Sequence, residues 1–128
     1  MMKKFISAFL IILLSAISVS AAGLRVADGV VTTQVVDRAP VDEITSYPAQ
    51  DGRLFCFTRI VGANTETQVT HVWLYGEREM ARVTLPVGSA SWRTYSSKKI
   101  LAVWKGAWRV LILDEEGNEI ATIPFTLL

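Results

Sequence analysis

Apolar and polar residues alternate along much of this chain, the pattern of half-buried β-strands, and the alternation is clearest between residues 69 and 85. Residues 69–75 (VTHVWLY) and 78–85 (REMARVTL) flank the dipeptide Gly76-Glu77. A two-residue loop that begins with glycine is typical of a type II′ hairpin turn, since glycine readily adopts a positive φ. The pattern therefore predicts a β-hairpin centred on this dipeptide.

The predicted register gives this hairpin two unlike faces. A two-residue loop pairs residues directly across the ladder: Tyr75 with Arg78, Trp73 with Met80, Val72 with Ala81, and His71 with Arg82. One face then carries the apolar side chains Val72, Leu74, Ala81, Val83 and Leu85. The other face combines aromatic and polar side chains: His71, Trp73, Tyr75, Met80 and Arg82. We expect the second face to be a recognition surface; the alternative is that Trp73 is a buried core residue.

Further short strands are expected on both sides of the hairpin. Residues 24–36 alternate with a kink at Gly29, residues 54–61 are apolar on both faces and so suit a central strand, and 41–52 suit a surface connection. Strands are also predicted at 89–97, 106–113 and 119–128, and Pro124 places the last at an edge or a bulge. About seven short strands with regular turn signals predict an all-β fold, an immunoglobulin-like antiparallel β-sandwich.

The N-terminal segment has the pattern of a signal peptide. Lys3 and Lys4 precede an apolar run over residues 5–19, and small residues follow. This order predicts a signal peptide over residues 1–22, cleaved near Ala21 or Ala22, with retention as a membrane anchor as the alternative. The remainder, residues 23–128, is expected to be a single domain that is periplasmic or secreted, without stable membrane insertion after cleavage.

Charge and cysteine content narrow the function classes. The chain has 13 Lys and Arg against 12 Asp and Glu, and removing Lys3 and Lys4 leaves 11 against 12. Such a balance gives no electrostatic case for binding nucleic acid. Cys56 is the only cysteine, so no internal disulfide can form. Because Cys56 lies between Phe55 and Phe57, we expect it to be buried on a central strand.

No set of residues suits catalysis or metal binding well. Residues 96–99 (SSKK) hold a Ser-x-x-Lys spacing, but no helix is predicted there. His71 is the only histidine, and the acidic residues 114–118 suit a hairpin turn better than a calcium loop. We therefore expect a non-enzymatic protein without cofactor or metal. The alternative is a cell-wall-directed hydrolase or transferase that uses Ser96 and Lys98.

Several motifs resemble those of one bacterial family. They are LFCFTR (54–59), HVW (71–73), EMARV (79–83), SWRTYSSK (91–98) and GAWRV (106–110). Over about residues 51–128 the chain resembles the domain of unknown function 2914 family. The resemblance implies a bacterial envelope protein with a small β domain and brings no established activity. The candidate ligand-binding residues are the polar and aromatic motif residues His71, Trp73, Arg82, Trp92, Arg93, Thr94, Ser96 and Lys98. The expected function is an exported binding or accessory module that recognises an envelope glycan, peptide or protein.

Overall fold

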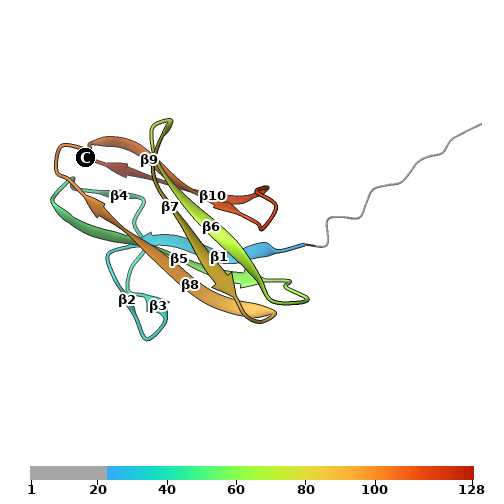
Figure 1. Cartoon of the computed structure of the whole chain (residues 1–128). Helices are drawn as coiled ribbons and strands as arrows, with labels where there is room; N and C mark the ends of the chain where they lie inside the picture. Colours follow the sequence, from blue (N-terminus) through green and yellow to red (C-terminus); the bar gives the residue numbers. More distant parts are fainter. Residues whose placement is uncertain (1–22) are drawn as a thin grey trace, which may run out of the picture.

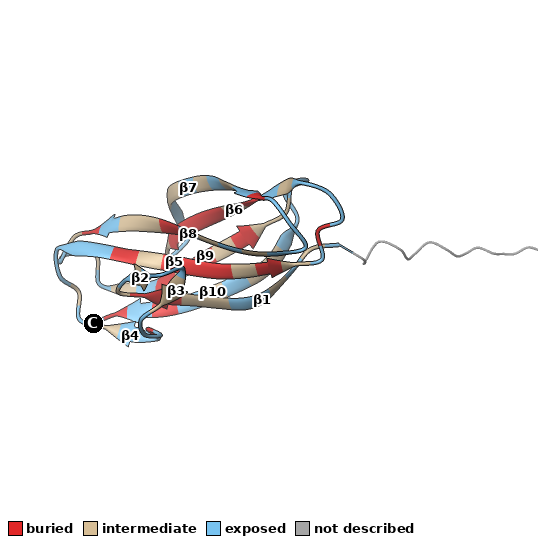
Figure 2. Cartoon of the chain, turned by 90° about the horizontal axis from the view of Figure 1, so that it is seen from below, coloured by how far each residue is buried: buried red, intermediate tan, exposed pale blue. Residues whose placement is uncertain are grey.

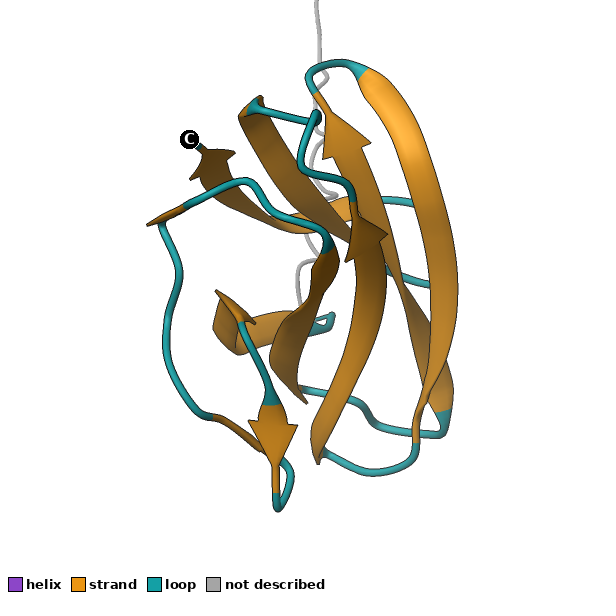
Figure 3. Cartoon of the chain, turned by 90° about the vertical axis from the view of Figure 1, so that its left-hand side faces the viewer, coloured by secondary structure: helices purple, strands orange, loops and turns teal. Residues whose placement is uncertain are grey.

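Every regular element that the structure describes is a β-strand. The structure is a computed structural model that describes residues 23–128, so the predicted signal peptide lies outside the described residues (Figure 1). The strands are β1 (Arg25–Thr32), β2 (Val35–Val36), β3 (Ala39–Pro40), β4 (Ser46–Tyr47), β5 (Gly52–Val61), β6 (Thr67–Tyr75), β7 (Arg78–Val87), β8 (Ser91–Ile100), β9 (Gly106–Leu113) and β10 (Glu119–Leu127). Figure 3 shows strands and loops without a helix in this range, which confirms the all-β prediction. Residues 23–128 accordingly include no helix of the length and apolar character needed to cross a membrane.

The strands form two larger sheets and one small hairpin. One sheet has the order β1-β5-β8 and is antiparallel throughout. The other has the order β4-β10-β9-β6-β7, in which the short β4 runs parallel to β10 and the remaining neighbours are antiparallel. Strands β2 and β3 pair only with each other. The two larger sheets are layered one over the other in a sandwich-like arrangement (Figure 1).

The apolar core lies between the two larger sheets. It joins β5 side chains such as Cys56 and Ile60 to side chains of β6 and β9 such as Trp73, Val110 and Ile112, all 0% exposed. Buried and less buried positions alternate along the strands, most regularly along β9 (Figure 2). Strand β5 is the central strand of its sheet, so the predicted central position and burial of Cys56 are both confirmed.

The β6–β7 hairpin turns where the sequence predicts, but its register shifts by one residue. Gly76 has a φ of 59°, and Tyr75 pairs with Arg78 as expected. Further along, Leu74 pairs with Glu79 whereas Trp73 pairs with Ala81, so Met80 is the extra residue of a β-bulge. The predicted pairs beyond this point are wrong by one position: Trp73 with Met80, Val72 with Ala81, and His71 with Arg82.

The first predicted strand ends four residues early. Strand β1 stops at Thr32, where the Asp42 carboxylate accepts hydrogen bonds from the Thr32 hydroxyl over 2.6 Å and from the Thr33 amide over 2.8 Å. The chain then forms the β2–β3 hairpin, in which Asp37 and Arg38 have φ values of 52° and 63°. Positive φ at both central residues is what a type I′ hairpin turn requires, so residues 35–40 form a small projecting hairpin.

Two expected irregularities are present. The predicted kink at Gly29 corresponds to a register shift slightly earlier in β1, between Val26 and Asp28. Pro124 lies in β10 where that strand has only one neighbour, because β4 pairs with β10 only at Thr126 and Leu127. A residue without an N–H is tolerated at such a position, so the prediction of an edge for this strand is confirmed locally.

Candidate functional site

A chain of hydrogen bonds inside the core joins the two larger sheets. The Trp73 indole donates to the Ser96 hydroxyl oxygen over 3.0 Å, and the same oxygen lies 2.7 Å from His71 Nδ1. At the other side of the imidazole, Nε2 lies 3.2 Å from the Thr58 hydroxyl oxygen, and that hydroxyl donates to the Thr94 carbonyl over 3.4 Å. His71, Trp73 and Thr58 are fully buried and Ser96 nearly so. The polar groups of these buried side chains therefore have partners.

The hydrogen-bond pattern suits a neutral His71 imidazole. With the Thr58 hydroxyl hydrogen on the Thr94 carbonyl, His71 Nε2 supplies the hydrogen between His71 and Thr58. His71 Nδ1 then accepts the Ser96 hydroxyl hydrogen, and the imidazole is neutral. Burial lowers the pKa of His71 to about 4, which agrees with a neutral ring. The network is thus a buried structural element made of neutral groups.

Three candidate binding residues are consequently core residues. His71, Trp73 and Ser96 do not lie on an exposed face, so their predicted place in a recognition surface is wrong. For His71 and Trp73 on β6, the hairpin prediction fails because of the bulge at Met80. This bulge places Ala81 and the following apolar residues of β7 on the same face as Trp73, toward the core.

Two other candidates lie apart from each other on the surface. Arg82 is exposed on β7, and its guanidinium donates to both carboxylate oxygens of Glu79, over 2.9 and 3.1 Å. Lys98 is on β8, where its ammonium lies 5.1 Å from the centre of the Trp104 ring and donates to the Lys99 carbonyl. Burial, followed by nearby positive charge, lowers the pKa of Lys98. In the predicted alternative site, the Ser96 hydroxyl is therefore buried in the core, whereas the Lys98 ammonium contacts the Trp104 ring and the Lys99 carbonyl.

The remaining three candidates, Trp92, Arg93 and Thr94, do lie together. They border a cleft of about 350 Å³ that runs beside β8. Its lining comes from the β2–β3 hairpin, β5, β7 and β8: Val35, Arg38, Phe57, Pro86, Trp92, Arg93, Thr94 and Tyr95. The cleft thus combines two arginines with three aromatic rings.

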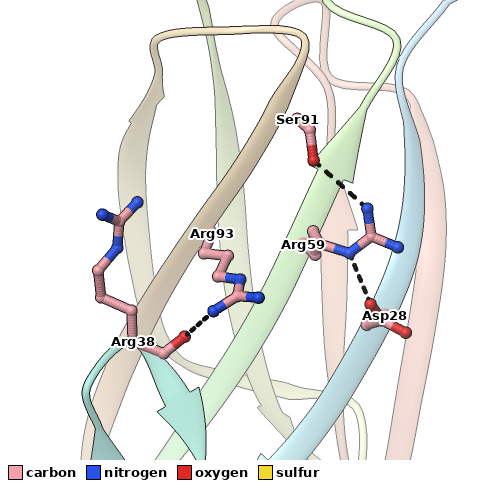
Figure 4. Close-up of polar contacts among 5 residues, drawn as sticks. All are labelled: Asp28, Arg38, Arg59, Ser91 and Arg93. Carbon is pink, nitrogen blue, oxygen red and sulfur yellow. Dashed lines mark hydrogen bonds and ion pairs between the residues drawn. The ribbon is translucent and has the colours of Figure 1, made fainter.

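Arg93 lies between Arg38 and Arg59 (Figure 4). Its guanidinium donates to the Arg38 carbonyl over 3.3 Å. Arg59 is held by Asp28 at 2.7 Å and also donates to the Ser91 hydroxyl over 3.3 Å. Among residues 23–128, the Arg38 guanidinium has no hydrogen-bond or ion-pair partner, so it is available to a ligand. We call Arg38, Arg59 and Arg93 the arginine cluster.

The concave surface extends beyond the cleft. Arg93 also lines a hollow of about 270 Å³ with Arg59 and Phe57, and another of about 580 Å³ with Arg38 and Arg59. All three hollows lie beside the β2–β3 hairpin, and the first also reaches round β8 to Trp92, Thr94 and Pro86. A ligand larger than one side chain can therefore contact the whole arginine cluster.

Arg38, Arg59 and Phe57 were not among the residues predicted from the sequence. For two of them the sequence signal was partial: alternation groups Phe57 with Arg59 on one strand and Arg93 with Tyr95 on another. Only the structure shows that β5 and β8 pair and place Arg59 opposite Arg93 and Phe57 opposite Tyr95. Alternate positions of residues 53–59 and 93–99 thus share one face. Arg38 had no such signal, since the Asp37-Arg38 turn lacks the glycine that usually marks a two-residue hairpin.

This arrangement suits binding. Guanidinium groups donate paired hydrogen bonds to carboxylate, sulfate or phosphate, and aromatic rings stack on planar or apolar groups. Within residues 23–128, no group of three His, Cys, Asp or Glu side chains is placed to hold a metal ion. The Cys56 thiol is buried, and burial raises its pKa, which disfavours the reactive thiolate.

An all-β module with a basic and aromatic cleft is the class that the geometry defines. The model of the family described as Protein of unknown function (DUF2914) matches residues 66–127, which include β6 to β10. The match agrees with the family that the motifs indicated, over residues 66–127. The match begins later than the expected boundary at residue 51, so the motif at residues 54–59 falls outside it. No curated protein matches the chain.

Proposed function

We propose that this protein is a non-enzymatic binding or accessory module of the bacterial cell envelope. Its cleft would bind a glycan, peptide or protein partner that carries an acidic group next to an apolar or planar one. The observation that carries this proposal is the lining of the cleft, where Arg38 and Arg93 lie beside Phe57, Trp92 and Tyr95. Tyr95 is 47% exposed, although large aromatic side chains stabilise a fold best when buried.

The two kinds of side chain contribute differently to such a site. A charge-assisted hydrogen bond contributes about 1.5 to 3 kcal/mol, and a stacked or cation–π contact about 0.5 to 2 kcal/mol. The arginines would select the acidic group and orient it. The rings would supply apolar contact area with little loss of side-chain freedom.

A catalytic role has less support. The Ser96 hydroxyl is enclosed in the core, accepts the Trp73 indole N–H and contacts His71. A nucleophile must reach its substrate, and the described clefts do not include Ser96.

Export is part of the proposal, and the sequence of residues 1–22 supports it. Two lysines, an apolar run and small residues follow one another there in the order of a signal peptide. The protein would then be periplasmic or secreted. The mass of the protein recovered from the periplasm tests this, since retention of residues 1–21 would exclude cleavage.

We further infer that the sandwich is of the immunoglobulin-like type. Taking only the seven long strands in chain order, the first, second and fifth form one sheet and the third, fourth, sixth and seventh form the other. Immunoglobulin-type sandwiches divide their strands in a similar way and bury a tryptophan on the third strand. Trp73 on β6 has the corresponding place.

Titration of the purified protein with three probe types tests the binding function. The probes are a muropeptide, an acidic oligosaccharide and an acidic peptide, and binding is read by calorimetry and tryptophan fluorescence. The proposal expects at least one probe to bind, and Arg93→Gln to weaken that binding about tenfold or more. Arg82→Gln is the matched control, because Arg82 is an exposed arginine on the other sheet. Binding that both variants leave unchanged, or no binding of any probe, would overturn the proposal.

A further inference from the structure

Strand β8 forms an open edge of the β1-β5-β8 sheet. It pairs with β5 over its whole length, from Ser91 to Ile100, without a register shift, and has no strand neighbour on its other side among the described residues. In an antiparallel pair, every second residue directs its N–H and C=O groups away from the partner strand. The outer side of β8 therefore offers a regular row of unpaired backbone groups.

Strand β7, an open edge of the other larger sheet, is protected in ways that β8 is not. Strand β7 contains the bulge at Met80 and a proline at position 86, and both interrupt the addition of another strand. On β8, the charged residues Lys98 and Lys99 protect only the C-terminal end. The first seven residues, 91–97, are regular and free of proline and lysine.

The outward backbone groups can be assigned to particular residues. The Thr58 hydroxyl on β5 reaches the Thr94 carbonyl, which indicates that Thr94 directs its backbone groups toward β5. Its neighbours Arg93 and Tyr95 then direct theirs to the open side. These are the residues whose side chains line the cleft.

The cleft follows this open edge. Four consecutive β8 residues, 92–95, line it, together with Pro86 from the edge of the other sheet. In Figure 4 the Arg38 side chain lies on the side of β8 away from β5. A strand added to β8 would therefore enter the cleft between the two sheet edges.

We propose that the ligand is an extended peptide segment that adds a strand to the edge of β8 and alternates acidic with apolar residues. The pleat of β8 sets this alternation, because Arg93 and Tyr95 project to one face and Trp92 and Thr94 to the other. Acidic side chains of the added strand would meet the arginine cluster, and apolar side chains would meet Trp92. Backbone hydrogen bonds supply affinity in this mode, and side-chain contacts supply specificity.

This inference rests on the proposed binding function and narrows its ligand to a peptide. A glycan lacks the regular N–H and C=O spacing that the edge of β8 could use. A second copy of the chain would bring a second arginine cluster to the same edge, and like charges oppose that pairing.

The test uses an acetylated and amidated valine–glutamate alternating octapeptide as the probe. Calorimetry compares it with the same peptide N-methylated at its central amides and with a valine–lysine version. We expect the first to bind and the other two to bind at least about tenfold more weakly. Equal binding of the methylated and unmethylated peptides would overturn strand addition, since methylation removes the backbone donors and keeps the charges.

Two variants at one position test the edge from the protein side. Tyr95→Pro removes an outward N–H that no strand uses, whereas Tyr95→Ala removes only the ring. The proposal expects Tyr95→Pro to weaken octapeptide binding beyond the effect of Tyr95→Ala, with both variants keeping the parent's β-sheet circular dichroism. Equal effects would overturn it, and so would a Tyr95→Pro variant that unfolds, because the N–H would then belong to the β5 ladder.

The outcomes separate this inference from the proposed function. If the octapeptide fails but the muropeptide or oligosaccharide binds through Arg93, the binding function stands and strand addition is wrong. If no probe binds, both fail. Concentration-dependent dimers that Tyr95→Pro abolishes, without peptide binding, would assign the edge to a second copy and overturn the peptide proposal.

Discussion

The hydroxyl oxygen of Ser96 accepts a hydrogen bond from the Trp73 indole and lies 2.7 Å from His71 Nδ1. One side chain on β8 thus satisfies two side chains of β6 across the core. Sandwiches are usually joined by apolar contacts alone, and here a polar connection with defined geometry is added. Loss of this polar connection should lower the unfolding free energy, which can be measured.

Ser96→Ala should destabilise the protein strongly for so small a change. It leaves the Trp73 N–H and His71 Nδ1 without their partner in the core, at a cost of about 1 to 3 kcal/mol for each group. Chemical unfolding monitored by tryptophan fluorescence measures the loss. Ser97→Ala is the matched control, because Ser97 faces the other side of β8, where it accepts a hydrogen bond from exposed Arg53. Equal effects of the two substitutions would contradict the buried network.

His71 should make stability depend on pH. Its pKa is about 4 in the folded protein against 6.5 in an unfolded chain, so the unfolded state binds the proton more readily. Stability therefore falls as the pH drops from above 6.5 toward 4, by about 2 kcal/mol between pH 7.5 and pH 5.

The comparison variant for this pH dependence is His71→Gln, whose amide can still accept from Ser96 and donate to Thr58. Unfolding free energies of both proteins are measured from pH 7.5 to pH 5. The parent should lose about 2 kcal/mol more than the variant over this range. Parallel curves would show that His71 is not held neutral by burial.

Trp73→Ala should act as a core deletion. Trp73 is fully buried and meets Phe125 edge-on, with ring centres 6.2 Å apart, so its removal should cost about 3 to 5 kcal/mol. Arg82→Ala should leave the unfolding free energy close to that of the parent, since within residues 23–128 Arg82 pairs only with exposed Glu79. A Trp73→Ala variant as stable as the parent would restore the exposed position that the hairpin pattern first predicted.

The hairpin shows why sequence analysis placed the turn correctly and the faces wrongly. Gly76 specifies the turn, and the first pair, Tyr75 with Arg78, follows from it. The bulge at Met80 has no sequence signal, because methionine has no special backbone preference. Yet one extra residue exchanges the two faces of everything beyond it, so Arg82 moves away from Trp73 and the apolar residues join it.

The candidate site was predictable in part for a related reason. Trp92, Arg93 and Thr94 lie together because they are adjacent on one strand. Arg38 and Arg59 reach the same place through long-range packing of the β2–β3 hairpin and pairing of β5 with β8. Alternation within a strand reveals which residues share a face, but it does not reveal which strands become neighbours. Sites assembled from several strands are therefore the least visible in a single sequence.

Cys56 offers a direct test of the core. It is 0% exposed on the central strand β5, and burial raises the pKa of its thiol. The folded protein should therefore react with a thiol reagent only through opening of the sandwich, and denaturant should accelerate labelling steeply. Cys56→Ser should cost about 1 to 3 kcal/mol, because a buried hydroxyl needs a partner and the Ser96 hydroxyl, from the residue opposite on β8, is already engaged with Trp73 and His71. Cys56→Ala is the matched control, since it creates a small cavity without adding a polar group. A serine variant more stable than the alanine variant would show that a polar partner reaches this position.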